Sequence, residues 1–127
     1  KFFSEDSAER YLKARDYPRH VMASIKAMYE QVGKPIITDE GIVKKGLIIR
    51  HLVMPGHTED SKRILDWIKQ NTPEAAVNIM DQYRPCFKAR QFAEINRSIT
   101  LEEYVDVFEY GKELGLNLIE PRYVSHR

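Results

Sequence analysis

Two polar side chains interrupt an apolar segment, and they are the residues of this chain best placed to do chemistry. Residues 46–56 read Gly-Leu-Ile-Ile-Arg-His-Leu-Val-Met-Pro-Gly, with Arg50 and His51 in the middle. A near-continuous apolar run of this kind is typical of a parallel strand covered on both faces. Burying an unpaired guanidinium is costly, so Arg50 must have a partner or reach a solvated site. It either binds an anionic ligand or forms an internal ion pair with Asp81 or Glu120.

The other candidate groups carry weaker signals. The chain has four histidines, His20, His51, His57 and His126. No two of them have the spacing of zinc ligands, so each is expected to be structural or at the surface. Cys86 has no second cysteine and no obvious base beside it, which favours a buried thiol over a nucleophile. The glycines are too scattered for a phosphate-binding loop. The sequence therefore predicts neither a metal site nor a nucleophilic centre.

Helix caps and apolar spacing predict the elements that precede the apolar segment. Ser4 or Asp6 can cap a short helix through about Lys13, and a second helix is expected over about 18–32. Residues 35–45 suit a small hairpin with Gly41 at a left-handed position.

Strands and helices alternate after the hairpin. Three strands are predicted, over about 47–54, 77–82 and 116–119. Between them lie a helix over about 59–71, capped by Thr58 or Asp60, an irregular stretch over 84–98, and a helix opened by the capping box Thr100-Leu101-Glu102-Glu103. This order is typical of an α/β fold with parallel strands and right-handed crossovers.

The small number of parallel strands leaves two interpretations of the fold. A parallel sheet needs cover on both faces, and three strands alone leave apolar surface and a raw edge. The chain is then the C-terminal portion of a partial β/α barrel of the TIM type, with the hairpin as a small insertion. The alternative is a small complete α/β domain. In either case residues 1–127 form a single domain.

Composition excludes several classes of protein. The chain is 43% hydrophobic and 31% charged, and 20 basic against 19 acidic residues leave a net charge of +1. Interspersed charges of this balance give no case for nucleic acid or an anionic membrane as partner. No apolar run reaches the ~18–20 residues that cross a bilayer. One cysteine excludes an internal disulfide and suits a reducing cytoplasm.

Residues 50–56 resemble the Arg-x-(apolar)3-Pro-Gly strand of radical S-adenosylmethionine (SAM) enzymes of the pyruvate formate-lyase activating type. The likeness continues through 77–86 and 95–100 and extends over nearly the whole chain. That family builds a 4Fe–4S cluster on a Cys-x3-Cys-x2-Cys motif, whereas this chain has a single cysteine. The resemblance implies the C-terminal part of such an enzyme. The opening Lys1-Phe2-Phe3 favours excision from a longer protein over N-terminal processing or a natural short protein.

The resemblance implies specific roles for residues of the apolar strand and of the chain start. In the family the matching arginine and the apolar residue two positions further on contact SAM. These residues are Arg50 and Leu52 here, with Leu52 against the adenine. Lys1 matches the lysine of an Asp-x-Lys motif whose charged residues contact SAM, and otherwise it is an exposed terminal lysine.

The end of the next strand departs from the family pattern. Family members carry a histidine there that contacts SAM, and this chain has Asp81-Gln82-Tyr83. The resemblance then implies that Gln82 or Tyr83 contacts the adenine or ribose. The alternative is that Asp81 caps the loop and Tyr83 packs.

The resemblance also implies a function for the parent protein. In the family a reduced 4Fe–4S cluster cleaves SAM to a 5′-deoxyadenosyl radical, which abstracts hydrogen from a substrate. Activating members generate a glycyl radical on a partner enzyme, so a glycyl radical enzyme or another protein substrate is the implied partner. This chain would supply walls that face SAM and substrate, bind no cofactor tightly and show no turnover by itself.

Two further expectations come from the residues themselves. The stretch 84–98 is long, basic and rich in aromatic anchors, so we expect it to cover the substrate opening or to dock a protein substrate. An open sheet edge could let the chain pair with itself. The competing function is a non-catalytic α/β module that binds an anion or another protein.

Overall fold

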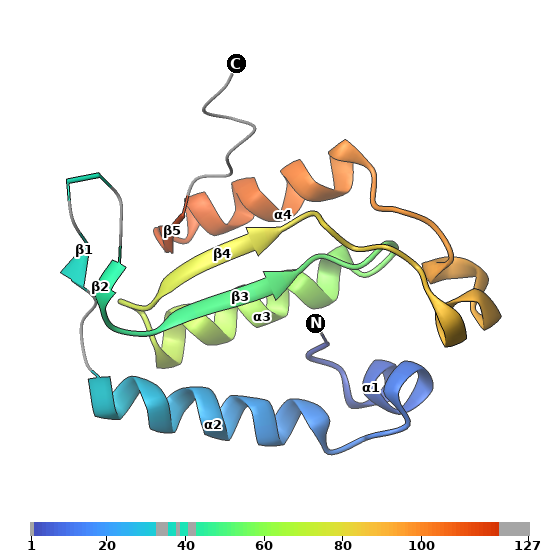
Figure 1. The fold of residues 1–127 in the computed structure, drawn as a ribbon, viewed down its shortest axis with the longest axis horizontal. Coiled ribbons are helices and arrows are strands. Elements are labelled where there is room, and N and C mark those ends of the chain that lie inside the picture. The colour runs from blue at the N-terminus through green and yellow to red at the C-terminus, as the bar shows by residue number, and fades with distance from the viewer. Residues whose placement is uncertain (1, 33–35, 38, 41–42, 120–127) are drawn as a thin grey trace.

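The computed structural model describes residues 2–32, 36–37, 39–40 and 43–119 (Figure 1). Its elements follow one another as α1 (Glu5–Leu12), α2 (Tyr17–Val32), β1 (Ile36–Ile37), β2 (Val43–Lys45), β3 (Ile48–Leu52), α3 (Thr58–Asn71), β4 (Ala76–Met80), the 3-10 turns η1 (Phe87–Gln91) and η2 (Ala93–Ile95), α4 (Leu101–Glu113) and β5 (Asn117–Leu118). None of the helices in these ranges is long and apolar enough to span a membrane.

Three parallel strands form the main sheet, in the order β3-β4-β5. Ile48 pairs with Ala76 and Leu52 with Met80, and Ala76 also pairs with Asn117 of β5. Helix α3 connects β3 to β4, and α4 connects β4 to β5. The short strands β1 and β2 pair antiparallel in a sheet of their own. The α/β class, the parallel sheet and the hairpin are therefore confirmed, while Gly41 lies outside the described residues.

The core fills one face of this sheet. Ile49 and Val53 of the β3 segment and Val77 and Ile79 of β4 point into it, with Leu65 and Ile68 from α3 and Tyr104 and Val107 from α4. Helix α2 adds half-buried side chains at its edge. Exposure alternates along β3, where Ile48 and Arg50 are exposed and Ile49 and His51 are buried. Among the described residues the helices therefore cover only the odd-numbered side of β3, and the predicted cover of its other face is not found there.

The carboxyl ends of β3 and β4 point toward one end of the molecule. Figure 1 shows α1 and the 3-10 turns gathered at that end, with the hairpin and β5 at the other. A second, smaller apolar cluster joins these segments and contains Phe2, Met54, Tyr83 and Ile95. Sites in parallel α/β folds form at this edge.

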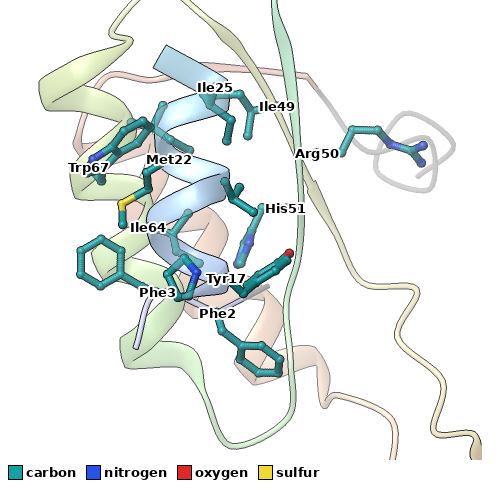
Figure 2. A pocket seen from close by; sticks show the side chains of 13 residues that line it. Phe2, Phe3, Tyr17, Met22, Ile25, Ile49, Arg50, His51, Ile64 and Trp67 are labelled. Carbon is teal, nitrogen blue, oxygen red and sulfur yellow. The ribbon is translucent and has the colours of Figure 1, made fainter. Parts of the chain in front are cut away.

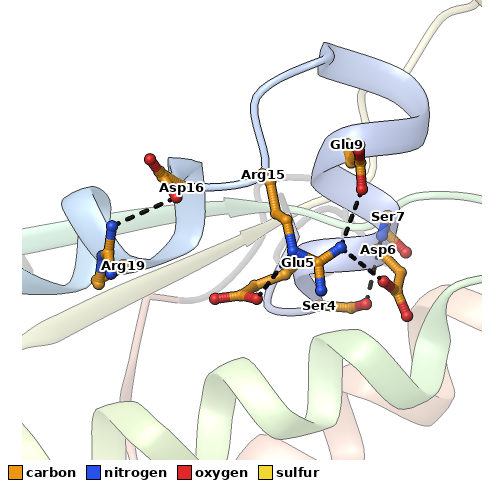
Figure 3. A network of polar contacts seen from close by, with 8 residues as sticks. All are labelled: Ser4, Glu5, Asp6, Ser7, Glu9, Arg15, Asp16 and Arg19. Atoms are coloured by element: carbon orange, nitrogen blue, oxygen red, sulfur yellow. Dashed lines mark hydrogen bonds and ion pairs between the residues drawn. The ribbon is translucent and has the colours of Figure 1, made fainter.

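Most predicted helix ends are confirmed. The Ser4 hydroxyl accepts the Ser7 N–H and caps α1, and Lys13 ends it with a φ of 55°. Thr100 and Glu103 form the predicted capping box. Arg15 folds back over α1 and pairs with acidic side chains along it (Figure 3). These exposed ion pairs contribute little to stability.

The predicted cap of α3 was wrong. His57 occupies the N-cap position without a side-chain hydrogen bond, and Thr58 is the first helical residue. The Asp60 carboxylate instead accepts the N–H groups of Phe3 and Ser4, at 2.7 and 2.9 Å. Those donors precede a helix and lack backbone partners, so a buried carboxylate between them satisfies both. Asp60 therefore fastens the start of the chain to α3.

The one-sided core predicts where a leucine deletion is costly. We expect Leu65→Ala to lower the free energy of unfolding by about 2–5 kcal/mol, because Leu65 is fully buried between the sheet and the helices. Leu101→Ala is the matched control, since Leu101 is 60% exposed, and we expect a change within about 0.5 kcal/mol. Urea titrations followed by circular dichroism measure both. Equal effects of the two substitutions would contradict this assignment of the core.

Candidate functional site

Five even-numbered residues of β3 and β4 form a second face of the sheet, here named the open face: Ile48, Arg50, Leu52, Asn78 and Met80. The sixth, Ala76, is fully buried. Ile48 is 42% exposed and Arg50 is exposed, while the other three are half-buried. Arg50 pairs in register with Asn78, and Leu52 with Met80. Figure 2 shows Arg50 pointing away from α2 and α3, on the opposite side of the strand from Ile49 and His51. The open face thus combines a cation, an amide and apolar side chains.

Arg50 is solvated rather than internally paired. Within the described part of the chain it makes no ion pair or hydrogen bond through its side chain, and Asp81 is likewise exposed and unpaired there. The alternative of an Arg50–Asp81 ion pair is therefore not found, and Glu120 lies outside the described residues. A free guanidinium on a sheet face is available to an anionic ligand.

The other predicted SAM contacts lie in different surroundings. Leu52 packs at the border of the smaller apolar cluster, so it links the open face to the carboxyl edge. Gln82 is exposed just beyond β4. Tyr83 is buried, and its hydroxyl donates to the Ile95 carbonyl at 2.8 Å, so it packs as the alternative expected. Whether Gln82 or Tyr83 contacts a ligand stays a prediction, and Lys1 lies outside the described residues.

A cavity of about 190 Å³, named here the edge cavity, lies at the carboxyl edge of the sheet. Its walls come from the N-terminal segment, α1, the end of β3 and the segment around η1 and η2. Phe2, Met54, Phe92 and Ile95 make it largely apolar. Cys86 lines it and is exposed, so the expectation of a buried thiol was wrong: the chain beyond Arg84 runs along the surface.

Tyr11, which lines the edge cavity, belongs to a row of hydrogen-bonded polar groups. The Tyr11 hydroxyl donates to Glu94 Oε1 at 2.9 Å and lies 2.9 Å from His57 Nε2. Arg10 contacts the same Glu94 oxygen, at 2.9 Å from Nε and 2.7 Å from Nη2. Since the single hydroxyl hydrogen of Tyr11 is directed to a carboxylate, the His57 Nε2 atom must carry the proton that Tyr11 accepts. In this row His57 therefore donates to Tyr11, and both Tyr11 and Arg10 donate to Glu94.

Ionisation in this row follows from its hydrogen bonds. A bond from its own backbone N–H, with those from Arg10 and Tyr11, lowers the pKa of Glu94 to about 2. Partial burial and the bond to Glu94 raise the pKa of Tyr11 above its usual value. Glu94 is thus a carboxylate and Tyr11 a neutral phenol at neutral pH. Aromatic contacts support the row, because Tyr11 stacks on Phe2 and meets Phe92 edge-on.

A second carboxylate anchors the turn after β3. Glu103 accepts the Gly56 N–H at 2.7 Å and the Thr100 N–H at 2.9 Å, and forms a two-pronged ion pair with Arg97. The Arg97 pair, with the two backbone donors, lowers the pKa of Glu103 to about 2. Gly56 has a φ of +75°, which a residue with a side chain rarely adopts. One side chain of α4 therefore fixes both the Pro-Gly turn and the end of the segment 84–98.

A separate cavity of about 120 Å³ lies between α2, α3 and β3 (Figure 2). His51 reaches into it, is 2% exposed and places Nε2 at 2.8 Å from the Ser61 hydroxyl. Burial lowers the pKa of His51 to about 3, so it stays neutral at physiological pH. His51 is a structural histidine, as predicted, and its surroundings are otherwise aromatic and aliphatic.

No group of three or more metal-ligating side chains occurs among the residues that the structure describes. No protein-family model matches the chain, and no solved structure matches it. A curated relative, an uncharacterized protein of Methanocaldococcus jannaschii, is 37% identical over 120 residues. The alignment covers 94% of this chain and 31% of the relative, so the chain spans about a third of that protein's length.

Sequence reasoning missed the row of Tyr11, His57 and Glu94. These residues come from α1, the turn after β3 and η2, and 46 and 83 positions separate Tyr11 from its two partners. No local spacing encodes such a contact. The one usable signal was the position of His57 directly after a Pro-Gly pair at a strand end, where functional side chains gather.

The polar row predicts which bonds hold the segment 84–98 in place. We expect Tyr11→Phe to increase the rate of amide hydrogen exchange around Phe92–Ile95 by about fivefold. The substitution keeps the ring and removes two hydrogen bonds, which together contribute about 1 kcal/mol of net stability. Tyr17→Phe is the control, since the Tyr17 hydroxyl makes no hydrogen bond among the described residues. If both variants exchange alike, Tyr11 does not hold the segment.

His51 predicts a loss of stability in mild acid. Its folded pKa lies below the unfolded value of 6.5, so the unfolded chain binds the proton first and stability falls as pH drops below about 6.5. Between pH 7 and pH 5 we expect a loss of about 2 kcal/mol in the free energy of unfolding. His51→Gln should remove most of this dependence, and His20→Gln, at an exposed position, should keep it. Urea titrations at both pH values test this, and an unchanged slope in His51→Gln would refute it.

Proposed function

We propose that this chain is the C-terminal part of a β/α barrel in a radical SAM enzyme of the pyruvate formate-lyase activating type, and that the open face is part of its SAM wall. The observation that carries the proposal is Arg50. It is a solvated, unpaired cation on the open face, in the strand that matches the Arg-x-(apolar)3-Pro-Gly pattern. A guanidinium in this position can hold the SAM carboxylate, and Leu52 offers apolar surface to the adenine.

The one-sided packing supports a barrel. In a β/α barrel the helices form an outer ring, and the opposite face of each strand points to the interior. Here α3 and α4 cover the odd-numbered face, and Arg50 and Leu52 lie on the other. β3 pairs only with β4 in the described sheet, so its other edge is free to pair with an earlier barrel strand. In the isolated chain the same edge can pair with a second copy.

The residues of this chain fit SAM and do not fit the cluster. A 4Fe–4S cluster needs several thiolate ligands, and the chain contains Cys86 alone. The cluster therefore belongs to a part of the parent protein outside these residues. When bound, the cluster and SAM supply the radical chemistry, while Arg50, Leu52, Gln82, Tyr83 and Lys1 are the candidates to bind and orient SAM. The 127-residue chain would accordingly show no turnover and only weak SAM binding.

The proposal extends to partner and compartment. A glycyl radical enzyme or another protein substrate would approach the carboxyl edge, where Lys88 and Arg90 of η1 are exposed. A protein with reduced iron–sulfur chemistry and a single thiol in this part of its sequence belongs in a reducing cytoplasm.

Two measurements on the protein encoded by the complete reading frame test this function. After anaerobic reconstitution we expect bound iron and sulfide. We further expect Arg50→Ala to weaken SAM binding about 10- to 100-fold, as the loss of a charged hydrogen bond does, with iron content and fold kept. Arg63→Ala, at an exposed position of α3, is the matched control and should bind SAM normally.

Two outcomes would overturn the proposal. A colourless protein without iron after reconstitution would exclude the enzyme and favour the non-catalytic α/β module. Unfolding of the Arg50→Ala variant, with no selective effect on SAM, would make Arg50 structural.

A further inference from the structure

The edge cavity has the form of a ligand site. It lies at the carboxyl edge of a parallel sheet, and its lining is mostly apolar with few polar groups. Leu52 of the open face packs against the same cluster that forms its wall, so the cavity adjoins the proposed SAM wall. The two features define one continuous region at the strand ends.

The polar groups of the edge cavity are already engaged, with one main exception. The Tyr83 hydroxyl donates to the Ile95 carbonyl, and the Tyr11 hydroxyl lies between His57 and Glu94. Arg84 lines the cavity, is exposed, and its side chain makes no ion pair or hydrogen bond within the described ranges. The cavity therefore offers apolar walls and one free cation, beside the thiol of Cys86.

Arg84 is the charged residue among those that line the edge cavity, and the sequence that follows it is basic. Residues 84–91 contain Arg84, Lys88 and Arg90 and no acidic residue. Glu94 is neutralised by Arg10, and Asp81 does not line the cavity. A ligand that enters here meets the Arg84 guanidinium, which favours an anion and disfavours a cation.

The volume limits the apolar part of the ligand. A cavity of about 150 Å³ lined by aliphatic and aromatic side chains holds one benzene molecule, and the edge cavity measures about 190 Å³. It has room for a single six-membered ring or a branched aliphatic group of similar size, and a short arm to a charged group.

We infer that the edge cavity binds a small carboxylate with one ring or a compact aliphatic group, with the ring among Met54, Phe92 and Ile95 and the carboxylate at Arg84. This goes beyond the proposed function, in which the substrate is a protein, because it assigns a further small-molecule ligand to the same carboxyl edge. The binding itself does not depend on the proposed function.

The test uses phenylacetate as the probe and the isotope-labelled 127-residue chain, without iron or SAM. We expect saturable shifts of the Arg84 and Ala89 amide signals in nuclear magnetic resonance spectra, and no binding of benzylamine, a cation of similar size. Arg84→Gln should weaken phenylacetate binding about five- to tenfold, given the partly screened charge. Lys26→Gln on α2 removes an equal charge away from the cavity and should leave the affinity unchanged.

A second variant tests the cavity rather than the charge. Ala89 lines the edge cavity, so Ala89→Met should fill it and abolish binding while Arg84 remains. Where that variant misfolds, nuclear Overhauser contacts between the phenylacetate ring and the methyl groups of Ala89, Ile95 and Met54 in the unmodified chain decide instead. Absence of binding, equal binding of benzylamine, or contacts to other methyl groups would overturn the inference.

The two proposals fail in distinguishable ways. If the chain does not bind phenylacetate, the inferred ligand class is refuted, and the iron and SAM measurements still test the proposed function. A full-length protein that holds no iron refutes the enzyme and leaves an anion-binding module with a defined cavity.

Discussion

The packing of α3 and α4 against a single face of the parallel sheet is the constraint on which the rest of this structure depends. Both crossovers return the chain on the same side, as right-handed connections between neighbouring strands in this order require. The contact is close at Gly111, where an added side-chain carbon would lie 3.3 Å from Ile79 and 3.4 Å from Leu118. Because the described helices pack on that side, Arg50 on the other face is exposed to solvent. A ligand or another part of a protein can lie on that face.

A few polar contacts between residues far apart in the sequence hold together the segments at the carboxyl edge of the sheet. Asp60 fastens the N-terminal segment to α3, Glu94 joins η2 to α1, and Glu103 joins α4 to the turn after β3. Each is a carboxylate that receives two or more donors, which is the arrangement that strengthens such bonds. The segment 84–98 is therefore joined to α1 through Glu94 and to α4 through Arg97.

The sequence predicted elements well and contacts poorly. The capping box at Thr100, the helix over 18–32 and the alternation that separates Arg50 from His51 are local patterns, and all three are confirmed. The role of Asp60 could not be foreseen, because its position suits an N-cap and its actual donors lie 56 and 57 residues away. The apolar run of β3 likewise suggested cover on both faces. On its even-numbered side Leu52 packs against the smaller cluster, whereas Ile48 is apolar and 42% exposed, for which the described core supplies no reason.

That unexplained apolar character is the strongest physical argument about what the open face is for. A sheet face that evolved to remain in water carries mainly polar side chains, so that apolar and polar residues alternate along the strand. Here Ile48, Leu52 and Met80 lie beside Arg50 and Asn78, and Ile48 is 42% exposed. Apolar walls around a few fixed polar groups are the composition of a binding cavity or a barrel interior. Exposed apolar side chains are costly in water and become favourable once another surface covers them, so the composition of the open face favours contact with a ligand or with further protein.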